Sequence, residues 1–154
     1  LTGEGLTGAF VGHDFELVEG ATSDVAFEAR GATLEAAFAA AAEALLALTV
    51  EEPASVRATV HRRVDLAEPD RELLLLRFLN ELVYLRDAEG LLLRPVALRI
   101  GSADGEQRLH AELAGERIDR SRHRLAADVK AATAHALRVA PADGGWRVTA
   151  TLDV

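Results

Sequence analysis

Three residues have side chains whose type and spacing packing alone does not explain: Asp24, Lys130 and Asp153. Asp24 follows a turn-forming cluster and opens an expected strand. Asp153 closes another strand, beside Val154 and its carboxylate. Three anionic oxygen donors at strand ends suit hard divalent cations, which carboxylates bind at roughly 2.0–2.6 Å. We therefore expect a metal site at Asp24, Asp153 and Val154, with Ca²⁺ favoured and Mg²⁺ or Mn²⁺ as alternatives.

Lys130 is the only lysine in a chain with 17 Lys and Arg residues. Its compact ammonium group could hold an anion such as a phosphate or a partner carboxylate. Simpler interpretations stay open for each polar residue considered so far. Asp24 could cap a turn, Asp153 could be solvated, and Asp128 could neutralise Lys130. His123, in a polar and irregular stretch, could be a structural loop anchor.

Alternation of apolar and polar residues predicts the strands that carry these groups. Val148, Ala150 and Leu152 should face the core, which places Asp153 on the polar face. In the preceding strand, strict alternation puts Val129 to Val139 (odd positions) on one face, and Asp128 and Lys130 on the other. The remaining expected elements are strands at 15–18, 24–30, 56–66, 91–100 and 108–115, a helix at 34–48 capped by Thr33, and a second helix that Glu68-Pro69-Asp70 opens, with Pro69 near its first position, and that Gly90 ends.

This order of elements, β-β-α-β-α-β-β-β-β, predicts the α+β class. We expect two helices packed on one face of a mixed, mainly antiparallel sheet. Residues 1–14 are rich in Gly and Thr and lack a sustained period, so they are expected to form a flexible leader. Residues 15–154 then form a single domain, because the chain is too short for two comfortable ones.

Composition excludes several classes of function. The absence of Cys excludes disulfides, thiolate metal sites and Cys nucleophiles, and it favours a cytoplasmic location. No apolar run reaches the length of a membrane span. A net charge of −8 argues against direct nucleic-acid binding, which depends on Lys and Arg neutralising phosphates. No Ser nucleophile motif, zinc-binding spacing or phosphate-binding Gly loop is present, so no catalytic residue is expected.

Short motifs recur along nearly the whole chain from Phe15. They are T-S-D-V at 22–25, G-x-T-L-E-x-A-F at 31–38, F-L-N-E-L-V-Y-L at 78–85, E-G-L at 89–91, G-E-x-x-D at 115–119, His123, D-V-K-A-A-T-x-H at 128–135, G-W at 145–146 and L-D-V at 152–154. Their order and spacing resemble the archeases, small protein partners of the GTP-dependent tRNA-splicing RNA ligase. One departure is Ala21, where the family usually has His.

The resemblance implies a non-catalytic activator that helps the ligase acquire its guanylate and turn over repeatedly. The ligase joins RNA ends bearing a 3′-phosphate or 2′,3′-cyclic phosphate to 5′-hydroxyl ends. Asp24, Asp153 and Val154 resemble the metal site of the family. Lys130 resembles the family's functional Lys. Asp128 and His123 are expected to support contact with the partner. Two alternatives remain: a chaperone-like protein-binding module, which needs an exposed apolar patch, and a small metal-dependent enzyme, which needs a general base near the carboxylates.

Overall fold

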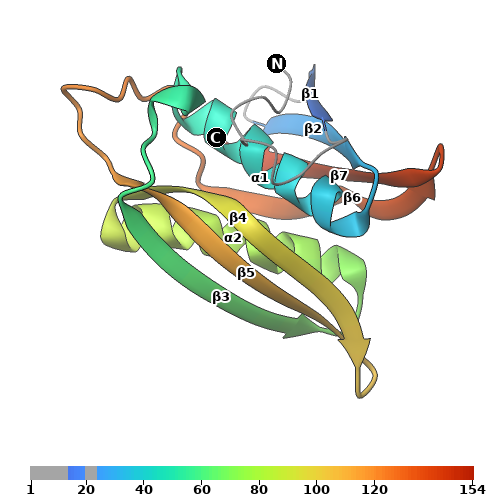
Figure 1. Cartoon of the computed structure of the whole chain (residues 1–154). Helices are drawn as coiled ribbons and strands as arrows, with labels where there is room; N and C mark the ends of the chain where they lie inside the picture. Colours follow the sequence, from blue (N-terminus) through green and yellow to red (C-terminus); the bar gives the residue numbers. More distant parts are fainter. Residues whose placement is uncertain (1–13, 20–23) are drawn as a thin grey trace.

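The computed structural model of the chain describes residues 14–19 and 24–154 (Figure 1). The expected leader lies outside these residues except for Asp14, which opens the first strand, and Ala21 lies outside them as well. None of the helices in the described part of the chain is long and apolar enough to cross a membrane.

The predicted α+β class and the predicted order of elements are confirmed. The elements are β1 (Asp14–Glu19), β2 (Asp24–Gly31), α1 (Leu34–Thr49), the 3₁₀ helix η2 (Pro53–Ser55), β3 (Val60–Glu68), α2 (Arg71–Glu89), β4 (Leu91–Ala103), β5 (Glu106–Arg117), β6 (Ala131–Ala142) and β7 (Gly145–Asp153). The third strand begins at Val60 and not at the expected Val56. Residues 53–55 form the 3₁₀ turn, and Val56 is buried in a small cluster with Leu46, Val50 and Leu92.

The strands divide into two antiparallel sheets where the sequence predicted one. The first has the order β1-β2-β7-β6 and the second has the order β3-β5-β4. Every strand pairing within the described residues is antiparallel. Alternation along a strand reports which side chains are buried but not which strands are neighbours, so one sheet and two sheets give the same pattern.

Both helices lie between the two sheets (Figure 1). Helix α1 packs on β1, β2 and β7 of the first sheet and on β4 of the second. Helix α2 packs on β6 of the first and on β3, β4 and β5 of the second. The main core is accordingly built from the inner faces of both sheets and from most of the helix surfaces, and Phe38 of α1 stacks on Phe78 of α2 with ring centroids 6.3 Å apart.

The helix ends follow from local sequence. Thr33 caps α1 by accepting a hydrogen bond from the Ala36 N–H at 3.0 Å, as predicted. Asp70 caps α2 in the same way through the Leu73 N–H at 2.8 Å. Gly90 ends α2 with φ at 68°, a left-handed conformation that residues with a Cβ rarely adopt. These caps fix where α2 begins and ends relative to the strands beside it.

The strand β6 departs from the regular alternation that the sequence predicted. Its pairing with β7 shifts between Thr133 and Arg138, and Ala136 in this bulge has a φ of 54°. Ala132 and Val139 are consequently both buried, although they are an odd number of residues apart and would lie on opposite faces of a regular strand. The prediction that the odd positions from Val129 to Val139 share one face was therefore wrong.

Candidate functional site

Asp24 and Asp153 lie directly opposite each other in the antiparallel pairing of β2 and β7. Opposite residues in such a pair project to the same face of the sheet, with Cβ atoms roughly 4.5–5.5 Å apart. Both residues are half-buried, while Phe27 and Leu152 on the opposite face are enclosed in the core. The predicted alternation of both strands thus places two carboxylates together at one end of the sheet.

Two facing carboxylates offer oxygen donors of the kind that Ca²⁺, Mg²⁺ and Mn²⁺ prefer. Val154 follows Asp153 directly, and its half-buried side chain packs against the core, so its main-chain carbonyl lies at the same end of β7. Across residues 14–19 and 24–154, no group of three or more His, Asp and Glu side chains is arranged to hold a metal ion. The oxygen donors that this end of the sheet offers are therefore two side-chain carboxylates and main-chain oxygens.

Lys130 is attached to this end of β7 through its main chain. Its N–H donates to the carbonyl oxygen of Asp153 at 2.8 Å, and the next residue, Ala131, is paired with Asp153 across the strands. The side chain of Lys130 is exposed, as predicted, and so is that of Asp128, which lies 3.4 Å from the Arg86 guanidinium. The main chain of Lys130 thus lies at the same end of the sheet as the two carboxylates.

His123 lies in a different environment, and its side chain is fully buried. Its Nδ1 accepts the N–H of Asp119 at 2.9 Å, so its Nε2 carries the proton that is donated to Glu116 at 3.0 Å. The ring closes the turn from Asp119 to His123, where the His123 N–H also bonds to the Asp119 carbonyl. This geometry fits the structural alternative for His123, because an enclosed ring cannot be presented to a partner.

Glu116 is the centre of the charged cluster around His123, and the sequence analysis missed it. The backbone N–H of Arg57 and the side chain of Arg122 lower its pKa from 4.5 to about 2, with a smaller contribution from His123. The hydroxyl and N–H of Ser121 similarly lower the pKa of Asp119. The available signal was the G-E-x-x-D motif followed by His123, which brings both acids next to the loop that leads to Lys130.

That loop, residues 118–130, is also bonded to the end of α1. The N–H groups of Ala126 and Ala127 donate to the carbonyls of Thr49 and Leu48, each at 2.9 Å. The last carbonyls of a helix have no partner within the helix, so the loop satisfies groups that would otherwise be unpaired. The segment before β6 is consequently held by α1 on one side and by the Glu116 cluster at its start.

Comparison with known proteins finds a matching family and similar sequences. Residues 15–154 match the model of the Archease protein family (MTH1598/TM1083). A protein archease from Thermococcus gammatolerans is 38% identical over 126 residues, which cover 81% of this chain and 88% of the relative. A protein archease from Pyrococcus furiosus is 34% identical over 134 residues, covering 86% and 94%.

Solved structures agree with the sequence comparisons. The solution structure of Methanobacterium thermoautotrophicum protein 1598 has a TM-score of 0.80 and 31% identity, and the match covers 91% of this chain and 98% of that one. The crystal structure of an archease from Thermotoga maritima, described as a possible chaperone, has a TM-score of 0.59 and 18% identity over 90% and 96%. At that identity the second likeness concerns the fold alone.

Proposed function

Because this chain belongs to the archease family, we propose that it is a non-catalytic activator of a tRNA-splicing RNA ligase. The partner ligase would join 3′-phosphate or 2′,3′-cyclic phosphate RNA ends to 5′-hydroxyl ends, and this protein would promote its guanylylation and its repeated turnover. The observation that carries the proposal is the direct opposition of Asp24 and Asp153, with Lys130 bonded to the main chain of Asp153.

In this proposal Asp24, Asp153 and a main-chain oxygen of Val154 hold a divalent cation, with Ca²⁺ favoured. Such a cation would supply positive charge that organises anionic oxygens around it. The two carboxylates bind it and set its position at the end of the β2–β7 pair. Lys130 offers a second positive charge for phosphate or carboxylate oxygens of the ligase or its nucleotide.

The charge of the chain supports a protein partner over RNA. A net charge of −8 gives little attraction to a phosphate backbone, so the RNA would be bound by the ligase itself. The chaperone-like alternative requires an exposed apolar surface. The large apolar residues that are most exposed in the described part, Leu17, Leu73, Tyr84 and Val96, come from three different elements, β1, α2 and β4.

The test is multiple-turnover ligation by the cognate ligase with GTP and Mn²⁺, with this protein at substoichiometric amounts. We expect a large gain in turnover with the wild-type protein and little gain with Asp24→Ala, Asp153→Ala or Lys130→Ala. Asp143→Asn, in the turn that joins β6 to β7 at the far end from Asp153, is the matched control and should activate fully. Activation that survives all three alanine substitutions would remove the site assignment. No activation by wild type, with an active ligase, would overturn the proposed function.

A further inference from the structure

Helix α2 contacts the segment that carries Lys130 from the side away from β7. The side-chain amide of Asn80 pairs with the main chain of Ala132: its Oδ1 accepts the Ala132 N–H at 2.8 Å, and its Nδ2 donates to the Ala132 carbonyl at 3.1 Å. Among the described strands β6 is the last of its sheet, so no described strand lies beside this edge. Asn80 thus satisfies both main-chain groups of Ala132 as a neighbouring strand would.

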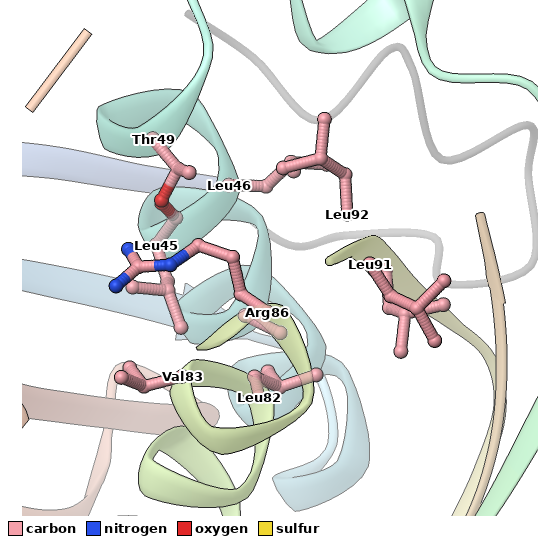
Figure 2. Close-up of a pocket in the computed structure, with 10 residues that line it drawn as sticks. Leu45, Leu46, Thr49, Leu82, Val83, Arg86, Leu91 and Leu92 are labelled. Atoms are coloured by element: carbon pink, nitrogen blue, oxygen red, sulfur yellow. The ribbon is translucent and has the colours of Figure 1, made fainter. Parts of the chain in front are cut away.

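Arg86 makes a second contact from the same helix. Its Nη2 donates to the carbonyl oxygen of Val129 at 2.5 Å, and its guanidinium also binds Asp87. Only 12% of the Arg86 side chain is exposed. In Figure 2 the stem of Arg86 leaves α2 and runs beside Leu45 and Thr49 of α1, at a cavity of about 20 Å³. A charged group this enclosed is held in one place by the partners it finds there.

These contacts bind the main chain on both sides of Lys130. Val129 is bound by Arg86, Ala132 is bound by Asn80, and the Lys130 N–H itself donates to Asp153 on the opposite side. In the ladder between β6 and β7, only three regular pairs follow Lys130 before the register shift, because pairing is interrupted after Thr133 and resumes at Arg138. The main chain of Lys130 therefore depends on α2 for its position relative to Asp153.

We propose that Asn80 and Arg86 are positioning residues that fix Lys130 beside the carboxylates of Asp24 and Asp153. The proposal rests on the proposed function in one respect, the role of Lys130 in activating the ligase. Neither residue would contact the ligase or the cation. Displacement of a functional group by about 1 Å can cost on the order of a hundredfold in rate, so loss of the clamp is expected to act through Lys130.

The clamp itself is tested without the ligase, by amide hydrogen exchange measured with NMR. We expect Asn80→Ala to speed exchange of the Ala132 N–H by about tenfold or more, because that amide loses its acceptor. Asn80→Asp keeps an acceptor for this N–H but places a second carboxylate oxygen against the Ala132 carbonyl, so it should retain only part of the protection. Arg86→Ala should speed exchange at Lys130 and move the resonances of its side chain, which are easily assigned because the chain has one lysine. Arg77→Ala, on the exposed side of α2, is the control. Unchanged exchange at both positions would overturn the clamp.

The functional part is tested by a double-mutant cycle in the ligation assay. Asn80→Ala and Arg86→Ala should each reduce activation by about tenfold or more in the wild-type background, and by less than about twofold when Lys130→Ala is also present. Arg86→Lys, which retains one donor, should recover part of the loss. Equal losses in both backgrounds would show a general structural role and overturn the proposal. If wild type does not activate the ligase, the proposed function fails, and the exchange measurement still decides whether the clamp exists.

Discussion

Asp24 of β2 and Asp153 of β7 are a directly opposed cross-strand pair of like charge. Like charges in this position destabilise an antiparallel pair, where opposite charges would contribute roughly 0.2–1 kcal/mol. A bound cation reverses the sign of that interaction, since each carboxylate then attracts the shared ion. The pairing of these two strands is therefore expected to be coupled to metal binding.

Because of this coupling, one substitution should raise the free energy of unfolding without metal and lower it, relative to wild type, with metal. In EDTA, Asp153→Asn should raise the free energy of unfolding by up to about 1 kcal/mol, because it removes the repulsion. With Ca²⁺ at about 100 times its dissociation constant, wild type should gain about 2.7 kcal/mol and the variant much less. Urea unfolding in EDTA and in CaCl₂ measures both quantities. Asp143→Asn should behave as wild type, and a full Ca²⁺ effect in both Asp24→Asn and Asp153→Asn would contradict the site.

Glu116 should make stability depend on pH in the acid range. The pKa of its carboxyl is about 2 in the folded protein, below the usual 4.5, because Arg57 and Arg122 donate to the ionised form. A lowered pKa contributes stability that is fully present above pH 4.5 and is lost as the pH falls toward 2. Glu116→Gln should be less stable than wild type at pH 6, and the difference should shrink toward pH 2.

Urea unfolding between pH 6 and pH 2 measures this difference. Glu112→Gln is the control, because Glu112 lies on the same strand β5 but is exposed. We expect the difference in free energy of unfolding between wild type and Glu116→Gln to decrease as the pH falls. The same difference for Glu112→Gln should stay small throughout. A gap that is independent of pH would show that Glu116 acts through shape and neutral hydrogen bonds and not through its charge.

The faces on which Asp24 and Asp153 lie were predictable from sequence, whereas the pairing of their two strands and the residues around them were not. Alternation was regular through β2 and through β7. Because Phe27 and Leu152 face the core, Asp24 and Asp153, an odd number of residues away from them, face the other side of the sheet. Alternation failed in β6, because the bulge after Thr133 depends on hydrogen bonds from Thr149 and Thr151 to the carbonyls of Ala136 and His135. Such contacts come from another strand and leave no local pattern.

The division into two sheets and the contacts of α2 could not be predicted from the sequence, because they too depend on which elements are neighbours in space. The apolar residues of α2 predicted a buried helix, but they do not say which strand lies beside Asn80 or Arg86. A structural role for His123 was among the expectations, but its hydrogen-bond partner Glu116, seven residues earlier on β5, was not predicted. Which residues lie beside Asn80, Arg86 and His123 is set by the tertiary structure, so their roles become visible only there.

Gly115 should tolerate no side chain, whereas Gly101 should. A Cβ on Gly115 would lie 1.8 Å from the carbonyl oxygen of Leu92 on the neighbouring strand, a contact that only movement of the backbone could relieve. We expect Gly115→Ala to cost roughly 1–3 kcal/mol or more. Nothing lies within 4 Å of a Cβ built on Gly101 of β4, so Gly101→Ala should change stability by less than about 0.5 kcal/mol. Urea unfolding of the two variants compares them, and equal stabilities would contradict the close packing of β4 on β5.

The ion pair between Glu43 and Arg94 should be costly to break and cheap to replace. Glu43 of α1 is 4% exposed, and it accepts from Arg94 of β4 through both oxygens, at 3.0 and 3.3 Å. Removing one partner of a buried pair leaves the other charge without compensation, so Glu43→Ala should lower the free energy of unfolding by about 3–5 kcal/mol. Arg94 retains a bond to the Pro53 carbonyl at 2.8 Å, which places the expected value toward the lower end.

Replacing both partners tests whether the pair stabilises the fold or only avoids a penalty. Glu43→Leu combined with Arg94→Met keeps the volume and removes both charges, and such exchanges are often neutral or stabilising by about 1–4 kcal/mol. We therefore expect the double variant to be far more stable than Glu43→Ala. Urea unfolding of the full double-mutant cycle gives the interaction energy directly. Activation of the ligase should be unchanged in the double variant, because the pair joins α1 to β4 and not to the β2–β7 end that carries Asp24 and Asp153.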